Sequence, residues 1–390
     1  MEKKGFFDGS IGQYLLPGII LQSVLIGGGY ATGREIVEYG AKFGALGWLS
    51  GFATFLGFAI VCSLSFELIR LFKAYDFKSF IKLIAGPLCY VFDIIYFLFM
   101  IIIIAVMSSA TGSVVEETTG LNYWVGVTAI TVIVGLLNFY GEHLIEHFET
   151  LGTILLYIGY IMFSVLVIST HYDNIGTVFA NNDSSFVAGA TAFDSIWNGI
   201  IYMAFNLVVL PASFFTIKRQ TSRKQSIISG IIGGILMTIP WFLTYFSVMG
   251  FYPSDKVLSA PVPWVVMMQS CNAGSFMYIF FGIVMGWTLI ETATGIIHAM
   301  LTRIDKSLEE RHGGQLSRTQ KGGLTIGILI ASMGMAQIGI IDLIAKGYNA
   351  LAYAFIAIFL IPLFTVGVYK IHQKRKEELA ALAVVNSEEK

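Results

Sequence analysis

The chain is a series of long apolar stretches separated by short polar segments. Ten windows lack Asp, Glu, Lys and Arg, and they cover residues 9–33, 43–66, 94–115, 118–141, 150–172, 195–217, 225–254, 257–290, 322–341 and 347–369. A helix that crosses the hydrocarbon core of a bilayer needs about 20 mostly apolar residues. We therefore predict ten membrane-spanning helices. The eighth is expected to begin near Gly274 and to run past Glu291 to about Thr302.

The composition agrees with this pattern. Of the 390 residues, 56% are hydrophobic and 13% are charged, and the net charge is −1. A soluble domain carries about twice that charged share. Nucleic-acid binding is not expected, because the chain has no domain-scale excess of basic residues. The sequence predicts an all-α integral membrane protein whose surroundings are the lipid bilayer, and it leaves the oligomeric state open.

The distribution of basic residues predicts an orientation. With ten spans, 20 of the 24 Lys and Arg residues fall on the side that holds the N-terminus. The four on the opposite side are Arg34, Lys42, Lys256 and Lys346. Cytoplasmic loops of membrane proteins are rich in Lys and Arg. We therefore predict a multi-pass protein with both termini in the cytoplasm.

The first apolar window contains four glycines within residues 27–33. Each glycine costs about 1 kcal/mol of helix stability, and lipid cannot satisfy the backbone groups that a break sets free. A broken helix beside a ligand cavity accounts for this run, and close packing of small residues against another helix is the alternative.

The sixth window carries Pro211, five residues after Asn206. Proline removes one helical hydrogen bond and disfavours helix immediately before it. We therefore expect a second break near Asn206, with a simple proline kink as the alternative. Tyr202 lies one turn earlier on a polar face, and Phe205 is placed to cover a bound solute or to pack in the membrane core.

The two interruptions fall in windows one and six of ten, which are corresponding positions of two sets of five. This arrangement is typical of inverted-repeat transporters with a binding site near the bilayer midplane. The predicted parts are a cytoplasmic N-terminus (1–10), a first five-helix repeat (11–170), an extracellular connector (171–190), a second five-helix repeat (191–372) and a cytoplasmic tail (373–390).

The string Gly27-Gly28-Gly29-Tyr30-Ala31-Thr32-Gly33-Arg34-Glu35, with ten spans and two interruptions, resembles the LeuT-type fold of the amino acid–polyamine–organocation superfamily. It looks most like the bacterial YkvI-like membrane protein family, and the resemblance covers about residues 8–372. The resemblance implies alternating-access transport coupled to an ion or to protons, with the substrate held at the two breaks. It also implies that the third and eighth helices line the same cavity, and that the protein lies in the bacterial inner membrane.

Backbone N–H groups at the start of the outer half-helix can hold a substrate carboxylate, because the helix dipole is positive there. On the third span, Ser108 is a small polar residue that either faces the substrate or serves close helix packing. The predicted substrate-binding residues are Gly27, Gly28, Gly29, Tyr30, Ala31, Thr32, Ser108, Tyr202, Phe205 and Asn206.

Arg34 follows the first break on its outer side. A charged side chain that faces lipid costs several kcal/mol, so we expect it to face a pore or a partner. The resemblance implies an outer ion-pair gate, with Asp194 or Asp342 as the partner. Snorkelling of Arg34 to the interface is the alternative. Glu35 and Glu38 are interpreted as solvated loop charges.

Glu291 is predicted to lie near the middle of the membrane. It precedes Arg303 by 12 residues, which is about 18 Å of helix in a core about 30 Å thick. A carboxylate at that depth must be protonated, paired or bound to a cation. Proton coupling through Glu291 is the leading interpretation, and a structural hydrogen bond from a neutral Glu291 is the alternative.

Thr288 and Thr292 share the helix face of Glu291, together with Gly295 and His298, and this polar face should point into the bundle. In sodium-coupled relatives the resemblance implies adjacent hydroxyls on this helix. Thr292 and Thr294 are not adjacent, which favours H⁺ over Na⁺ as the coupling ion.

The sequence thus predicts a secondary active transporter of a small polar solute, such as an amino acid, and not an enzyme. We predict no catalytic residues, no metal site and no cofactor besides the coupling ion. The alternative is a membrane-embedded sensor or receptor of the same fold, which binds a small molecule without transporting it.

Overall fold

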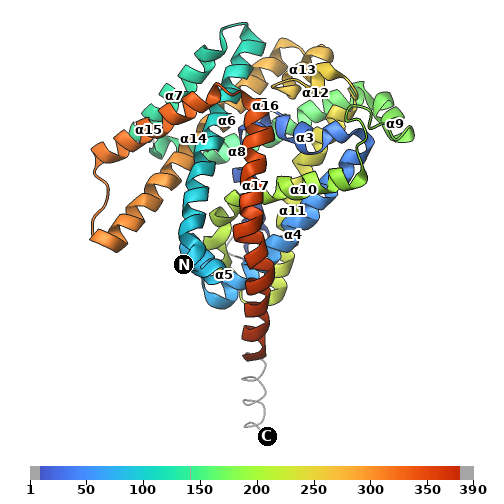
Figure 1. Cartoon of the computed structure of the whole chain (residues 1–390). Coiled ribbons are helices and arrows are strands. Elements are labelled where there is room, and N and C mark those ends of the chain that lie inside the picture. Colours follow the sequence, from blue (N-terminus) through green and yellow to red (C-terminus); the bar gives the residue numbers. More distant parts are fainter. Residues whose placement is uncertain (1–8, 141, 378–390) are drawn as a thin grey trace.

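The computed structural model describes residues 9–140 and 142–377, and every regular element in these ranges is a helix (Figure 1). The first half of the chain forms α1 (Ser10–Leu25), α2 (Gly28–Ala31), α3 (Arg34–Tyr39), η2 (Ala41–Leu46), α4 (Gly47–Phe72), α5 (Phe77–Ala85), η3 (Gly86–Leu88), α6 (Cys89–Thr119), α7 (Tyr123–Tyr140), α8 (Glu142–Thr170) and α9 (Tyr172–Ala180). The second half forms α10 (Ala192–Asn206), η4 (Leu207–Arg219), α11 (Arg223–Met249), α12 (Asp255–Leu258), α13 (Pro263–Ser270), α14 (Ser275–His312), α15 (Arg318–Ala336), α16 (Ile340–Asp342), η5 (Leu343–Tyr348), α17 (Asn349–Phe355), η6 (Ile356–Leu360) and η7 (Leu363–Gly367).

Several of these helices are long and apolar enough to cross a bilayer. Six pass that test in the described ranges: Ala41–Phe72, Phe77–Thr119, Ala192–Arg219, Arg223–Met249, Ser275–Glu309 and Ile340–Glu377. A seventh span is possible where α8 meets α9 at a bend of 72°. The structure therefore confirms an all-helical membrane protein, whereas length and composition single out six or seven of the ten predicted spans.

Local sequence signals account for several helix ends. The helices α10, α11 and α15 each begin with a capping box, formed by Thr191 with Asp194, Ser222 with Gln225, and Ser317 with Gln320. In each box the two side chains satisfy backbone N–H groups that the first turn leaves unpaired. Gly274 directly precedes α14, as predicted, but the helix continues past Thr302 to His312.

Four helices, α1, α4, α10 and α11, make the most extensive contacts with one another and form the centre of the bundle. The helices α4 and α11 pack along each other, while α1 packs on α11 and α10 packs on α4. Glycines allow this proximity: a Cβ at Gly18 would lie 2.9 Å from Gly233 Cα, and one at Gly199 would lie 2.3 Å from the Ser50 carbonyl oxygen. Thus α1 approaches α11, and α10 approaches α4, through a glycine at each contact.

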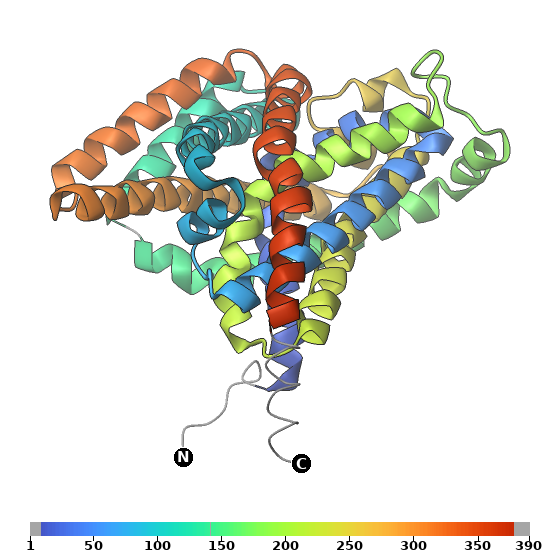
Figure 2. The ribbon, with the colours of Figure 1, turned by 60° about the horizontal axis from the view of Figure 1, so that its bottom comes forward.

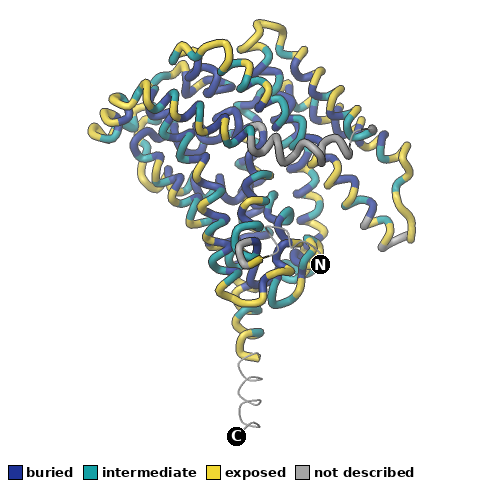
Figure 3. Tube along the Cα trace, turned by 180° about the vertical axis from the view of Figure 1, so that it is seen from behind, coloured by how far each residue is buried: buried dark blue, intermediate teal, exposed yellow. Residues whose placement is uncertain are grey.

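Around this centre, α14 and α15 extend to one side of the molecule (orange in Figures 1 and 2). Buried residues follow the inward faces of the helices and exposed residues the outward faces (Figure 3). Many of the exposed residues are large and apolar, such as Ile94 on α6, Val165 on α8 and Ile283 on α14, each at least 60% exposed. Soluble proteins avoid such extended apolar surfaces, so these faces suit contact with lipid chains.

One end of the bundle gathers the segments predicted to be cytoplasmic. The Gln220 and Gln225 side chains donate to the backbone and side-chain oxygens of Gln13 at 3.0 and 2.6 Å. Lys370 near the end of the last helix donates to the Leu83 carbonyl oxygen at 2.9 Å. The first two contacts join α1 to the junction of η4 and α11, and the third joins Lys370 to α5. The charge pattern predicts that these segments lie on one side of the membrane.

The opposite end gathers the segments predicted to be extracellular. The predicted connector contains the helix α9, whose Asn174 amide donates to the Met249 and Tyr252 carbonyl oxygens at 3.1 Å each. The backbone N–H of Ala45 donates to the Asp183 carbonyl oxygen at 2.8 Å, and Tyr245 donates to the Gly44 carbonyl oxygen at 2.7 Å. The predicted connector therefore packs across the end of α11 and against η2.

Candidate substrate site at the two helix interruptions

The glycine-rich segment breaks the first helix, as predicted. The helix α1 ends at Leu25, and Ile26 leaves helical geometry with φ −76° and ψ 77°. The short α2 follows, and Gly33 has φ 83°, a left-handed conformation that glycine adopts without strain. The sequence prediction of a broken helix, rather than of close packing alone, is confirmed at this segment.

Protein groups satisfy much of the backbone at this break. The Thr32 hydroxyl donates to the Gly29 carbonyl oxygen at 2.9 Å and accepts from the Arg34 backbone N–H at 3.3 Å. The Tyr160 hydroxyl donates to the Tyr30 carbonyl oxygen at 3.0 Å. Buried backbone groups need partners, so Thr32 and Tyr160 stabilise the break itself.

The second interruption differs from the prediction. No gap separates α10 from η4; the chain changes at Leu207 from α-helical to 3₁₀ hydrogen bonding, and Pro211 lies inside the 3₁₀ segment. Proline has no backbone N–H to donate in either kind of helix, so the α-helix stops before it and the chain continues in 3₁₀ geometry. Asn206 sits at this change of geometry, and its amide donates to the Tyr202 carbonyl oxygen at 2.9 Å.

A cavity of about 430 Å³ lies where the two interruptions meet. The ends of α1 and α10, the start of η4 and the facing sides of α6 and α14 form its walls. The lining residues are Ser23, Val24, Leu25, Gly27, Glu35, Tyr96, Phe99, Met100, Ile103, Met107, Phe205, Asn206, Val208, Val209, Pro211, Ala212, Glu291, Thr292, Gly295, Ile296, Ala299 and Tyr348. Its volume is in the range of sites for small organic molecules.

The cavity brings together part of the predicted substrate and coupling sites. Gly27, Phe205, Asn206, Glu291 and Thr292 line it. Seven other predicted residues do not line it: Gly29, Tyr30, Ala31, Thr32, Ser108, Tyr202 and Thr288. The surroundings of Gly28 lie outside what the structure describes.

The third and eighth predicted spans contribute as the resemblance implies. A Cβ at Gly27 would lie 3.0 Å from Met107 Cε of α6 and 3.4 Å from Thr292 Cγ2 of α14. Both helices therefore pack closely against the end of α1, and the absence of a side chain at Gly27 allows this close packing.

Sequence reasoning missed Glu35. This residue was interpreted as a solvated loop charge, but it is 5% exposed and lines the cavity. Its carboxylate lies against Gly29, where a Cβ would come within 2.2 Å of Glu35 Oε1, and it accepts a hydrogen bond from the Tyr30 backbone N–H. The apolar residues Ile36, Val37 and Tyr39 that follow were the available sign that the helix continues into the core.

Aromatic side chains close the cavity on the side of α2 and α3. The ring centroids of Tyr39 and Tyr202 lie 5.7 Å apart, those of Tyr202 and Phe205 5.3 Å, and those of Phe205 and Tyr348 4.7 Å. Tyr30 packs on Tyr202 at 6.4 Å. Together these rings fill the space between α3, α10 and η5.

Arg34 forms an ion pair, but not with the predicted partners. Its guanidinium lies 2.9 Å from Glu38 Oε2, and it donates to the carbonyl oxygens of Leu258 and Ala260 at 2.5 and 3.3 Å. Glu38 also binds Lys42 at 2.6 Å. Glu38 is therefore a partly buried partner of two cations and not a solvated charge, and Arg34 links α3 to the segment after α12.

Asp194 and Asp342 are engaged elsewhere. Asp194 accepts from the backbone N–H and the hydroxyl of Thr191 in the capping box of α10. Asp342 pairs with Lys346 one turn later at 3.0 Å. Neither pairs with Arg34, because each finds a local partner on its own helix; that part of the gate prediction is wrong.

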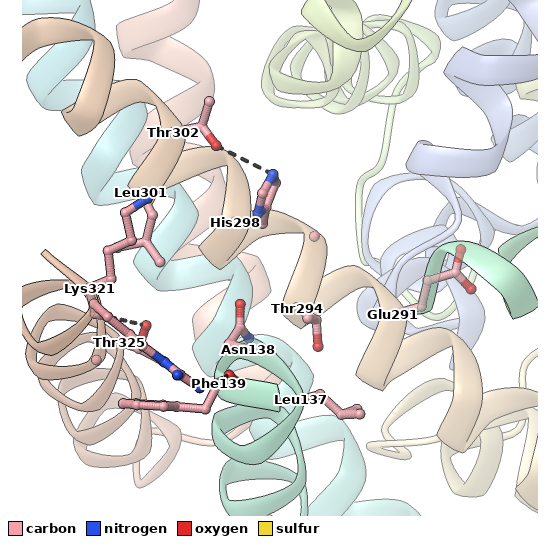
Figure 4. A pocket seen from close by; sticks show the side chains of 13 residues that line it. Leu137, Asn138, Phe139, Glu291, Thr294, His298, Leu301, Thr302, Lys321 and Thr325 are labelled. Carbon is pink, nitrogen blue, oxygen red and sulfur yellow. Dashed lines mark hydrogen bonds between the residues drawn. The ribbon is translucent and has the colours of Figure 1, made fainter. Parts of the chain in front are cut away.

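Glu291 lies between the central cavity and a second one of about 310 Å³. The second cavity is formed by α7, α14 and α15, and Glu291 and Gly295 line both. Figure 4 shows Glu291, Thr294 and His298 along α14, opposite Asn138 of α7 and Lys321 of α15. A carboxyl group on α14 thus borders two separate spaces.

The polar residues predicted to share one face of α14 (Thr288, Glu291, Thr292, Gly295 and His298) do not all face the same direction; we call them the polar stripe. Thr288 is buried and donates to the Val284 carbonyl oxygen of its own helix at 2.9 Å. His298 is exposed in the second cavity, with its Nε2 atom 3.4 Å from the Thr302 hydroxyl. Only Glu291, Thr292 and Gly295 of the stripe reach the central cavity. Among the described residues, no group of three or more His, Cys, Asp and Glu could hold a metal ion.

Comparisons with known proteins agree with this architecture. No family model matches the chain. It is 23% identical over 255 residues to the uncharacterized membrane protein YkvI of Bacillus subtilis (strain 168), a match that covers 63% of this chain and 68% of that protein.

Two solved structures are similar over 93% of the chain. One is a Na⁺-coupled sialic acid symporter in a substrate-bound outward-open state, with 10% identity, 82% of that chain covered and a TM-score of 0.63. The other is a manganese transporter of Eremococcus coleocola, with 13% identity, 80% of that chain covered and a TM-score of 0.57. The resemblance predicted from the sequence is confirmed, and the chain has the LeuT-like fold of this symporter.

Proposed function

We propose that the protein is a secondary active transporter of a small polar solute, and that the solute binds in the central cavity. The observation that carries the proposal is the position of this cavity, at the point where α1 breaks and α10 changes to η4. Interrupted helices that meet at a midplane site are the hallmark of inverted-repeat transporters. The fold shared with the symporter and the manganese transporter supports the same conclusion.

The proposal includes ten spans in two oppositely oriented sets of five, with the boundaries predicted from the sequence. The reciprocal packing of α1 on α11 and of α10 on α4 supports this, because it relates the first and second helices of the two sets. The contacts of Gln13 with Gln220 and Gln225 support an inner end that holds both termini. Residues 1–8 and 378–390, in the predicted cytoplasmic ends, lie outside the described residues.

In this proposal the structure represents an inward-facing conformation with its outer side closed. Most lining residues of the first span precede the break, and the lining residues of η4 follow Asn206. The cavity therefore extends toward the predicted inner end. On the outer side, the cluster of Tyr30, Tyr39, Tyr202 and Phe205 blocks the path. Alternating access then requires these rings to separate while the inner half-helices come together.

The coupling ion in this proposal is H⁺, carried by Glu291. Support comes from its place on the cavity wall and from the second cavity on its other side, which can give a proton a separate route. Sodium bound near Thr288 and Thr292 is the alternative, although the Thr288 hydroxyl is turned to its own helix.

Arg34 is proposed as part of the outer closure, through Glu38 and the Leu258 carbonyl oxygen. In a variant whose three cysteines are replaced and Met107 is changed to Cys inside the cavity, Arg34→Ala should raise the rate of labelling by an outside, membrane-impermeant thiol reagent several-fold. The control is Arg70→Ala, which removes the Glu67 pair elsewhere in the bundle. Equal labelling rates with and without the Arg34→Ala substitution would remove Arg34 from the gate.

A ligand-binding receptor of the same fold is the second candidate, favoured by the closed outer cluster if it never opens. Binding itself is tested by thermal shift of the purified protein with amino acids, nucleobases and amines, with and without sodium, because a ligand stabilises the state it binds. Val209→Trp, which fills the cavity, should abolish the shift, and Val165→Trp on an exposed face should preserve it. An undiminished shift in Val209→Trp would move the site elsewhere.

A further inference from the structure

At the first break, the protein itself already engages several of the backbone N–H groups that a substrate carboxylate would need. The carboxylate of Glu35 lies against Gly29 and takes the Tyr30 backbone N–H. The N–H groups of Gly27, Ala31 and Gly33 donate to backbone carbonyl oxygens at 2.7–2.9 Å. A carboxylate of the protein thus stands where the sequence prediction placed a carboxylate of the substrate.

The charges on the cavity wall are all of one sign. Glu35 and Glu291 line it, and none of the described lining residues is Lys, Arg or His. Arg34 follows in sequence, but its guanidinium is directed to Glu38 and Leu258. Arg303 stacks on Tyr96, a wall residue, and its guanidinium pairs with Asp93.

The remaining wall suits an organic cation. Tyr96, Phe99, Phe205 and Tyr348 present aromatic rings to the cavity, and an ammonium group is attracted to the faces of such rings. A bare metal ion is less suited, because the described residues offer no cluster of three His, Cys, Asp or Glu side chains and most of the wall is apolar.

We infer that the solute bound in the central cavity is an organic amine, whose ammonium group pairs with Glu35 and which needs no carboxylate. This inference rests on the proposed function and names the substrate class of the same site. A carboxylate on the solute would face Glu35 and Glu291 without a cationic partner, and like charges brought together in a buried site cost several kcal/mol. An amino acid should therefore bind more weakly than the amine of the same skeleton.

The inference is tested on the wild-type protein with two matched series of probes. The first comprises phenethylamine, phenylalanine, 3-phenylpropionate and phenethyl alcohol, and the second the corresponding compounds with an isobutyl group in place of phenyl; Mn²⁺ alone is a separate probe. Thermal shift and equilibrium binding are measured for every probe. In at least one series, the amine should bind at least about tenfold more tightly than the amino acid, the carboxylic acid and the alcohol of that series. Equal binding of acid or alcohol, binding of Mn²⁺ alone, or binding of neither amine would overturn the inference.

Glu35→Gln tests the named contact. It keeps the size of the side chain and removes the charge, so amine affinity should fall at least about tenfold. The control is Glu67→Gln, because Glu67 is also 5% exposed but lies outside the central cavity. Unchanged amine affinity in Glu35→Gln would contradict the inference.

Uptake into proteoliposomes, measured with the same probes, distinguishes a failure of the amine inference from a failure of the proposed transport function. Amine binding that depends on Glu35 without any uptake supports the inference and contradicts the transport function. Uptake of the acid, with no amine binding, contradicts the inference and supports the transport function.

Discussion

Replacing Glu291 with Gln should abolish gradient-driven accumulation of solute while leaving exchange of solute across the membrane intact. The amide cannot release a proton, but it keeps the shape of a side chain that borders both cavities. Exchange needs only binding and alternating access, whereas accumulation needs the proton to move with the solute. Driven uptake should therefore fall to the level of protein-free vesicles.

The measurement is uptake of labelled solute into proteoliposomes with and without a pH gradient, followed by counterflow with unlabelled solute. Glu309→Gln is the matched control, because Glu309 is an exposed acid near the end of the same helix. Full accumulation by Glu291→Gln would exclude Glu291 as the proton carrier. Loss of both accumulation and counterflow would show that Glu291 serves binding and not coupling.

Gly44→Ala should prevent the protein from folding stably, whereas Gly86→Ala should be tolerated. The two glycines have nearly the same backbone conformation, with φ 54° and ψ −128° at Gly44 and φ 57° and ψ −127° at Gly86. An alanine in either place bears the backbone strain, about 1–3 kcal/mol. At Gly44 the new Cβ would also lie 2.1 Å from the Asp183 carbonyl oxygen, while at Gly86 it would meet no atom within 4 Å.

Comparing Gly44→Ala with Gly86→Ala therefore separates the effect of close packing around Gly44 from the backbone strain that both substitutions share. Melting temperature and monodispersity in detergent should show a loss of a few degrees for Gly86→Ala and loss of the folded peak for Gly44→Ala. Equal destabilisation of the two variants would mean that the connector does not pack against Gly44 as described.

Patterns that depend on neighbouring residues were read correctly from the sequence. Gly274 ends the loop before α14, and the glycine run at residues 27–33 breaks the first helix, because backbone freedom and capping are local properties. The resemblance, and not a local pattern, predicted that the third and eighth spans, here α6 and α14, line the cavity.

Features that depend on tertiary contacts were not predictable in this way. Charge alone suggested that Glu35 is solvated, whereas its side chain packs against Gly29 and is 5% exposed. Arg34 was expected to reach a distant acid, but Glu38 one turn away and the carbonyl oxygens of Leu258 and Ala260 are nearer partners. Pro211 predicted a break near Asn206; the α-helix does end there, but the chain continues without a gap as the 3₁₀ segment η4.

The most direct test of the account is uptake of the solute found by thermal shift into proteoliposomes that contain the purified protein, under an imposed ion gradient. The account predicts accumulation above the outside concentration, which Val209→Trp in the central cavity eliminates. Saturable binding of that solute with no flux in either direction would contradict it and would identify the protein as a receptor.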